Sequence, residues 1–217
     1  MCLTLESVSF AYPNGPAILN DASQTFEQGA YYLVRGPSGS GKSTLLRLLC
    51  RLEEIQSGSI YYKECDITDI PPASLRRCVA YVQQIPTLFP GNVRENLLLP
   101  FSFQSNKGIA PPSDLELVGY MNPFLLTDIT LDSEADRLSV GQSQRICLIR
   151  SLLLRPEVIL LDEPTASLDH ESAEVVLAKA AELSSQGITV IMISHSEKTP
   201  DGVTRIVSIR DKKLERQ

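Results

Sequence analysis

The chain has 217 residues, of which 43% are hydrophobic and 21% charged, and its formal net charge is -6 at pH 7. This length suits one domain with a substantial core, alone or with a subdomain, and the acidic balance argues against nucleic acid as a partner. Because no stretch approaches the roughly 18 uninterrupted apolar residues of a membrane span, and residues 1–6 lack a secretory signal pattern, we expect a cytosolic chain without spans of its own.

The N-terminal stretch predicts short antiparallel strands. Residues 3–10 alternate apolar and polar side chains, which is the period of a half-buried strand. A turn at residues 13–16 leads to a second strand-like stretch that contains Ile18, Leu19 and Phe26. Tyr12 stands near the end of the first strand. Its ring could stack on a purine base, or it could be an ordinary surface tyrosine.

Residues 36–44 fit the pattern G-x-x-x-x-G-K-[ST], with an apolar run at 31–34 before them and a helix-like run at 45–52 after them. A strand, a loop and a helix in this order are the setting of a phosphate-binding loop, whereas a Gly/Ser-rich connecting turn needs no such pattern. Glycines let backbone N–H groups turn toward a polyphosphate, and the helix N-terminus adds partial positive charge. Lys42 would neutralise the phosphates and Ser43 would ligate Mg²⁺. The expected nucleoside triphosphate site comprises Gly36, Pro37, Ser38, Gly39, Ser40, Gly41, Lys42, Ser43 and Thr44.

In the middle of the chain, strand patterns give way to short helical pieces separated by prolines. Residues 59–62 predict a strand that returns to the antiparallel sheet, residues 71–77 a short helix, and residues 79–82 a compact apolar strand that ends at Gln83 and Gln84. Prolines then divide residues 85–150 into short helical pieces, such as 92–99 and 113–120. We expect this region to be a helical subdomain inserted between core strands.

A helix opens within residues 138–145 and runs to about residue 153. Ser139, Gly141 and an amide-rich first turn that includes Gln142 offer donors suited to an anion. The same residues would also serve a capped helix that binds no ligand.

Residues 158–164 are four apolar residues followed by two acids and a proline. Such a run is typical of a central parallel strand, and ligands bind at the carboxyl ends of these strands in open α/β sheets. Asp162 could hold Mg²⁺ directly or through water, and Glu163 could orient and deprotonate an attacking water. A solvated strand end is the structural alternative.

The C-terminal part predicts a turn at residues 166–169, an amphipathic helix at 170–184, and a buried strand at 187–195 that ends at His195. His195 could donate to a γ-phosphate or fix the base, or it could be a surface histidine. Residues 205–209 predict a last strand, and residues 210–217 a charged tail.

The five cysteines are odd in number and scattered, without a C-x-x-C pair. They suggest neither a disulfide framework nor a zinc site. We expect reduced and mostly buried thiols.

In their order and spacing, these motifs resemble those of the ATP-binding cassette (ABC) ATPases over almost the whole chain. The resemblance rests on Tyr12, the loop from Gly36, residues 81–84, residues 138–145, residues 159–164, residues 167–169 and His195. It implies an α/β fold, a P-loop NTPase core with a mostly parallel sheet, an antiparallel β subdomain and an inserted α-helical subdomain. Residues 1–217 would be one domain, with its core at 1–84 and 151–217 and the helical signature subdomain at 85–150.

The resemblance also implies a role for each site residue. The implied ligands are ATP and Mg²⁺. Tyr12 would stack on adenine, Lys42 and the loop amides would hold the phosphates, Ser43 and Gln84 would ligate Mg²⁺, and Asp162 would support the metal. Glu163 would be the general base, and His195 would hold the γ-phosphate and the attacking water. Ser139, Gly141 and Gln142 would reach the ATP of a second copy, with Asp169 contacting across the dimer.

The implied assembly is a head-to-tail homodimer around two ATP molecules, bound on the cytoplasmic face of a membrane to a separately encoded permease. The region between Gln84 and Leu138 would make the contact with the permease. Its short length and its runs at residues 86–89 and 93–97 resemble the small ATPases of two-component bacterial exporters, including those proposed for metal export. A soluble ABC ATPase without a transport role and a regulatory module that does not hydrolyse ATP are the alternatives. One departure is Val140, where the family usually has glycine. A β-branched residue disfavours positive φ, so either this position is not left-handed or the loop shifts.

Overall fold

The computed structural model describes residues 2–194, 196 and 198–216, and His195 therefore lies outside the described residues. The strands are β1 (Leu3–Ala11), β2 (Ala17–Phe26), β3 (Tyr31–Arg35), β4 (Ser57–Tyr62), β5 (Cys65–Asp66), β6 (Val79–Val82), β7 (Val158–Asp162), β8 (Thr189–Ile193), β9 (Arg205–Arg210) and β10 (Lys213–Arg216). The α-helices are α1 (Lys42–Leu49), α2 (Pro72–Cys78), α3 (Val93–Leu98), α4 (Asp114–Met121), α5 (Val140–Leu152) and α6 (His170–Ser185). Short 3-10 turns cover Leu99–Ser102, Gln104–Asn106, Asn122–Phe124 and Ala135–Arg137.

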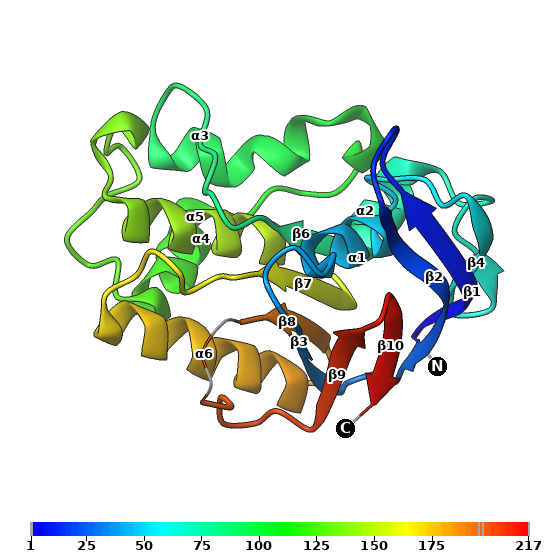
Figure 1. The fold of residues 1–217 in the computed structure, drawn as a ribbon. Helices are drawn as coiled ribbons and strands as arrows, with labels where there is room; N and C mark the ends of the chain where they lie inside the picture. The colour runs from blue at the N-terminus through cyan, green and yellow to red at the C-terminus, as the bar shows by residue number, and fades with distance from the viewer. Residues whose placement is uncertain (1, 195, 197, 217) are drawn as a thin grey trace.

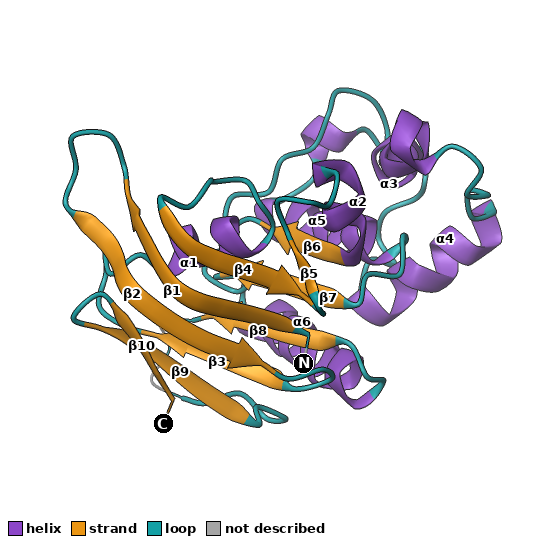
Figure 2. Cartoon of the chain, turned by 90° about the vertical axis from the view of Figure 1, so that its right-hand side faces the viewer, coloured by secondary structure: helices purple, strands orange, loops and turns teal. Residues whose placement is uncertain are grey.

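The strands form two sheets, which Figure 2 shows one in front of the other. The smaller sheet is antiparallel, in the order β2-β1-β4-β5. The larger has the order β10-β9-β3-β8-β7-β6, and it is parallel from β9 to β6. The predicted α/β fold with a mostly parallel sheet and an antiparallel partner is confirmed.

Two apolar cores lie on the two faces of the parallel sheet. The first fills the space between the sheets and includes Leu5, Tyr32 and Leu45, so α1 is packed between them. The second lies on the other face, where α5 and α6 cover the sheet (Figure 1), and includes Leu161 and Ile149. Because the side chains of a strand alternate between faces, each central strand contributes to both cores.

Strand β7 is buried along its whole length, and its carboxyl end leads into the candidate site. All five of its residues are buried, and it pairs in parallel with β6 on one side and β8 on the other. Burial on both faces explains the continuous apolar run in the sequence. The strand therefore holds Asp162 and Glu163 at a fixed place on the carboxyl edge.

The helical pieces expected between residues 85 and 150 are present as α3, α4 and the first part of α5. Asn92 caps α3 and Ser113 caps α4, each in a reciprocal box with the glutamate three residues later. The expected boundary at residue 150 falls inside α5, which runs on from this region and packs against the sheet. Within the described residues, every helix is too short or too polar to cross a bilayer.

The expected charged tail after residue 209 is wrong. Strand β10 forms a hairpin with β9, in which Leu214 is opposite Ile209. Asp211 and Lys212 form the turn with φ of 46° and 65°, the left-handed pair that favours a tight hairpin. The sequence pattern did not indicate this strand, because Leu214 is the one apolar residue in it. The side chain of Leu214 is nevertheless buried.

Candidate active site

The phosphate-binding loop lies between the end of β3 and the start of α1. Gly41 precedes the helix with φ of 95°, which glycine adopts without steric cost. A Cβ at this position would also collide with the side chain of Ile18, which reaches the loop from β2. The helix begins at Lys42, earlier than the apolar run at residue 45 indicated, so its N-terminal N–H groups belong to the loop itself.

Lys42 places a buried ammonium group beneath the loop. Its side chain is 5% exposed, and Nζ donates to the carbonyl oxygens of Gly36 at 2.9 Å and Pro37 at 3.0 Å. Burial lowers the pKa of Lys42, and the carboxylates of Glu163 and Asp162 act in the opposite direction. An anion bound in the loop would stabilise the charged form of this lysine.

A cleft of about 380 Å³ opens over the loop. Its lining brings together residues that are far apart in the sequence: Ile18, Ser38, Gly39, Gly41, Lys42, Ser43, Thr44 and Glu163. Tyr12 lies beside it, because its hydroxyl is 3.4 Å from Thr44 Oγ1 and donates to Glu53 Oε1 at 3.3 Å. The structure thus places the predicted aromatic residue next to the last residue of the loop.

Asp162 links the loop to the end of β7. The Ser43 hydroxyl donates to Asp162 Oδ1 at 2.9 Å, and the Tyr81 hydroxyl donates to Asp162 Oδ2 at 2.8 Å. Hydroxyl and carboxylate oxygens are the hard ligands that Mg²⁺ prefers, usually together with substrate phosphates. Within the described residues, no group of three or more His, Cys, Asp and Glu side chains could hold a metal alone. The donor set at Ser43 and Asp162 therefore fits a metal that is shared with a bound polyphosphate.

Glu163 meets Gln84 at the mouth of the cleft. Gln84 Nε2 donates to Glu163 Oε2 at 2.9 Å, so the amide oxygen is the atom that Gln84 could offer a metal. Glu163 has φ of 49°, which is uncommon for a residue with a side chain and costs on the order of 1 kcal/mol. Backbone strain of this kind often accompanies function.

The start of α5 lies well to the left of the phosphate-binding loop in Figure 1. Ser139 and Gly141 are absent from the lining of the cleft over the loop of their own chain. Ser139 caps the helix: its Oγ accepts from the Gln142 N–H at 3.2 Å, and Gln142 Oε1 accepts from the Ser139 N–H at 2.8 Å. Val140 is the first residue of α5, has no positive φ, and is 54% exposed. Of the two possibilities for Val140, the structure has the one in which this position is not left-handed.

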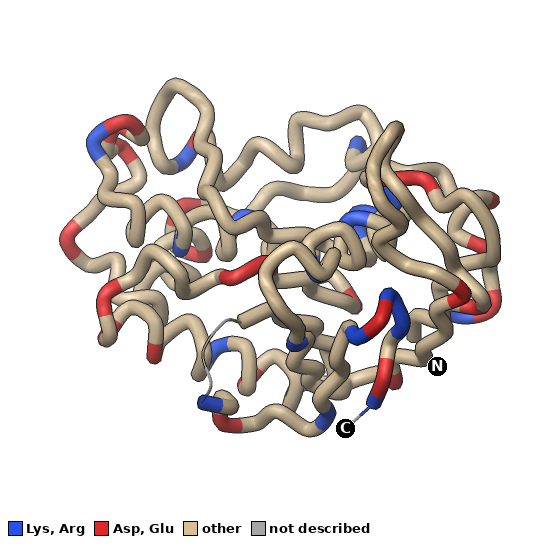
Figure 3. The backbone as a smooth tube through the Cα atoms, viewed as in Figure 1, with Lys and Arg blue, Asp and Glu red and all other residues tan. Residues whose placement is uncertain are grey.

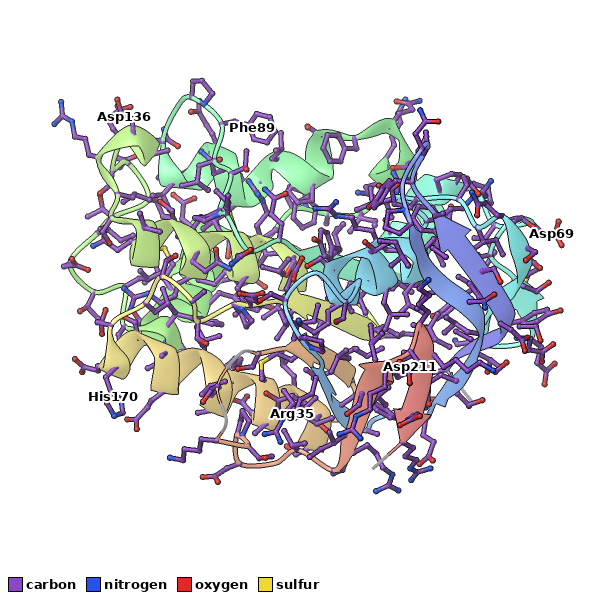
Figure 4. The ribbon with its side chains drawn as sticks, in the orientation of Figure 1. Arg35, Asp69, Phe89, Asp136, His170 and Asp211 are labelled. Carbon is purple, nitrogen blue, oxygen red and sulfur yellow. The ribbon has the colours of Figure 1, made fainter. Side chains whose placement is uncertain are left out.

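Asp169 caps α6 and accepts from the Ser172 N–H at 2.9 Å and hydroxyl at 2.7 Å. The backbone hydrogen bond from Ser172, followed by the one from its hydroxyl, lowers the pKa of the Asp169 carboxyl. His170 follows it and points outward from the N-terminus of α6 (Figure 4). Its side chain is 85% exposed. The role expected for His195 stays a prediction.

Two residues of this site were missed by sequence reasoning. Ile18 was assigned only to a strand, although it closes one side of the cleft. Tyr81 was assigned to an apolar strand and counted within the family motif at residues 81–84, but it was given no role, although its hydroxyl bonds Asp162. The one signal for Tyr81 was a polar hydroxyl within an otherwise apolar strand that is expected to be buried.

A second hollow, of about 410 Å³, lies between β6, α2 and the start of the helical region. Its lining includes Tyr81 and Phe89 together with three arginines, Arg76, Arg77 and Arg150. Phe89 stands at the upper edge of the molecule in Figure 4, with the Arg150 guanidinium 6.0 Å from its ring. We name this hollow the arginine groove. Elsewhere in the view of Figure 3, acidic and basic residues are interspersed.

Comparison with known proteins identifies the family. A family model described as ABC transporter matches residues 19–166. The probable iron export ATP-binding protein FetA of Escherichia coli is 32% identical, and the match covers 95% of this chain and 91% of that protein. The mitochondrial ATP-dependent permease MDL1 of Saccharomyces cerevisiae is 35% identical over 94% of this chain, which spans only 30% of the permease.

Solved structures agree with the sequence relatives. A dimeric ATP-binding cassette in a post-hydrolysis state with ADP and Pi matches 99% of this chain and 97% of its own with a TM-score of 0.87 and 26% identity. A bacterial Atm1-family ABC exporter with ATP bound also has a TM-score of 0.87, at 27% identity, over 98% of this chain and 38% of its own. The chain therefore belongs to the ABC transporter family, as an ATPase domain of the ATP-binding cassette type.

Proposed function

We propose that this chain binds and hydrolyses Mg-ATP, and that it drives a separate membrane subunit of a transporter. The observation that carries the proposal is the pair of contacts Ser43 to Asp162 and Gln84 to Glu163, which line up metal ligands and a carboxylate above the buried Lys42. Phosphoryl transfer depends mainly on positioning and charge stabilisation, and this arrangement supplies both.

Each residue has a proposed task. Lys42 and the loop N–H groups bind the phosphates, and Tyr12 stacks on the adenine. Ser43, Gln84 and Asp162 hold Mg²⁺, which when bound neutralises charge on the phosphates. Glu163 takes the proton of the attacking water, and Gln84 fixes the orientation of that carboxylate through its amide. His195 holds the γ-phosphate and the water in place.

We propose further that the site is completed by a second copy of the chain. Ser139, Gly141 and Gln142 are absent from the lining of the cleft over the loop of their own chain, and in this proposal they bind the ATP of a partner. Asp169 and its neighbours contact across the same interface. The dimeric cassette with ADP and Pi supports this arrangement by its close structural match. ATP would close the dimer and hydrolysis would open it.

The membrane partner is proposed from the relatives of the chain. The match to an iron export ATP-binding protein covers nearly all of that relative, which favours a stand-alone ATPase subunit and an export role. The chain would sit at the cytoplasmic face of the membrane, held by its permease through the region between Gln84 and Leu138. We propose that residues 85–150 form a helical subdomain that moves relative to the core formed by the remaining residues.

Steady-state ATP hydrolysis tests the proposal. Purified chain should hydrolyse ATP in the presence of Mg²⁺, and Glu163→Gln should lower kcat by about 100-fold or more, because a general base contributes 10²–10⁴. Glu64→Gln removes an exposed carboxylate and should leave the rate unchanged. Equal and negligible rates for the native chain and Glu163→Gln, with ATP still bound, would favour a regulatory module. Failure to bind ATP would overturn the proposal.

A further inference from the structure

Asp128 lies in the connection between the 3-10 turn at Asn122–Phe124 and helix α5. Its Oδ2 accepts from Gln142 Nε2 in the first turn of α5 at 2.7 Å. Leu126 and Leu131, on either side of Asp128, are buried in the second core, so the connection is anchored at both ends. The carboxylate is therefore held at a fixed place beside the start of the helix.

The chemistry of the two groups fixes the direction in which the Gln142 amide faces. An ionised carboxylate only accepts hydrogen bonds, so the NH₂ group must face Asp128 and the amide oxygen must face the other way. That oxygen accepts from the Ser139 N–H at 2.8 Å, and Ser139 Oγ accepts from the Gln142 N–H at 3.2 Å. This capping contact uses a lone pair of the Ser139 hydroxyl and leaves its proton available to an anion.

A hollow beside Gln142 explains why its side chain needs a second contact. The hollow has a volume of about 450 Å³, and its lining includes Thr130, Arg137 and Leu138 together with Gln142. A glutamine side chain has many rotamers, and here it would have room to turn away from Ser139. The hydrogen bond to Asp128 restricts the amide to the one orientation that also holds Ser139.

We propose that Asp128 is a positioning residue: it fixes the Gln142 amide, and through it Ser139, in the geometry that receives ATP bound to a second copy of the chain. Donors that are ordered in advance bind an anion more tightly, because their entropy is lost before the anion arrives. Asp128 acts through Gln142 and not on the phosphate itself, since a carboxylate would repel it. The inference rests on the proposed function and extends it to a residue outside the motif at 138–145.

The first experiment measures dimer formation with Mg-ATP in the Glu163→Gln background. Sedimentation gives the dissociation constant of the dimer for the parent chain, Asp128→Ala, Asp128→Asn and Asp136→Ala. Asp136 is an exposed aspartate of the same connection that points outward in Figure 4, so it controls for the loss of charge. We expect Asp128→Ala to raise the dissociation constant about tenfold, since each of the two ATP sites loses about threefold. Asp128→Asn keeps an acceptor for Gln142, so it should stay within about threefold of the parent chain, as should Asp136→Ala.

Calorimetry with dilute, monomeric chain separates positioning from a general loss of structure. ATP should bind single copies of Asp128→Ala and of the parent chain with the same affinity, because Asp128 does not line the cleft of its own chain. An unchanged dimer for Asp128→Ala would overturn the inference. Equal weakening by Asp128→Ala and Asp128→Asn, or by Asp128→Ala and Asp136→Ala, would also overturn it, because charge and not the contact would then be responsible.

The second experiment asks whether Asp128 acts through Gln142. Gln142→Ala alone should weaken the dimer, and adding Asp128→Ala should cause no further change, because the residue that transmits the effect is gone. Additive effects of the two substitutions would overturn the link. A parent chain that binds ATP and yet stays monomeric would instead contradict the proposed site between two copies, and the inference would fall with it.

Discussion

The amide of Asn96 holds the backbone of Phe89 through both of its polar atoms. Oδ1 accepts from the Phe89 N–H at 2.8 Å, and Nδ2 donates to the Phe89 carbonyl at 2.9 Å and to the Asn92 carbonyl at 3.0 Å. Asn96 is buried within α3, and the segment that it holds follows Gln84 and borders the arginine groove. Asn96 thus helps to fix the connection between the parallel sheet and the helical region, together with Arg150, whose guanidinium donates to the Thr87 carbonyl at 2.8 Å.

Replacing Asn96 with alanine should therefore loosen this connection. We expect a loss of about 2 kcal/mol of unfolding free energy, because two backbone groups of Phe89 lose their partners. Amide exchange of residues 85–91 should accelerate more than that of β7. Gln104→Ala, at an exposed position, serves as the control. Uniform acceleration over the whole chain would contradict the local role.

Lys42→Met separates nucleotide binding from folding. ATP affinity should fall by about 100-fold or more, because the site loses the buried cation under the loop. Stability without nucleotide should stay the same or rise, since an ammonium whose pKa is lowered by burial is replaced by an apolar side chain of similar length. Calorimetry and thermal melting measure the two effects. Lys63→Met, which removes a surface ion pair with Glu157, should leave ATP affinity intact.

The presence of valine at position 140, where the family usually has glycine, should not weaken dimer formation. Val140 is an exposed first residue of α5 in a helical conformation, so Val140→Gly should change the dissociation constant of an ATP-bound Glu163→Gln dimer by less than about threefold. Ser139→Ala removes a helix cap and should cost about 1 kcal/mol of stability. Sizing experiments with Mg-ATP would disprove the first expectation if Glu163→Gln stayed monomeric and Val140→Gly in that background dimerised.

Strand β10 should contribute to stability as a part of the core. Leu214→Ala should cost about 2–3 kcal/mol in chemical denaturation, because its side chain is buried against the hairpin partner and the first core. Lys213→Ala, one residue away and exposed, should cost less than about 0.5 kcal/mol. Equal effects of the two changes would show that β10 lies loosely on the sheet.

Thiol alkylation should distinguish exposed from buried cysteines. Burial raises the pKa of Cys50 to about 12, so the folded chain holds it as an unreactive thiol at pH 8 and still at pH 9.5. Cys65 is exposed and should be alkylated first. Mass spectrometry of partially labelled chain measures the order, and unfolding in denaturant should make the two react at similar rates. Rapid labelling of Cys50 in folded chain at pH 8 would contradict its burial.

Local patterns were sufficient for much of the site. The loop at residues 36–44 requires specific backbone conformations at short range, and the apolar run of β7 follows from burial on both faces, so both could be read from the sequence. Tyr81 could not, because its contact with Asp162 depends on which strand lies beside β7. The same holds for Ile18, which reaches Gly41 only because the antiparallel sheet packs over the loop.

Isolated polar or apolar residues were the second source of error. Asn96 resembles any helical amide in sequence, and its burial arises from the path of the backbone around Phe89. Leu214 stands among charged residues, so the pattern indicated a solvated tail. In both cases the contact depends on a single residue, and periodicity cannot detect a single residue.

The pairing of β3 has a consequence for biogenesis. This strand leads into the phosphate-binding loop, yet its neighbours on both sides, β8 and β9, come from residues 189–193 and 205–210. Contacts between such distant segments form late and slowly. Until the ribosome has added residues 189–210, at about 5 to 20 residues per second, β3 lacks both neighbours. We therefore expect the loop to become competent to bind nucleotide only after this segment has been made.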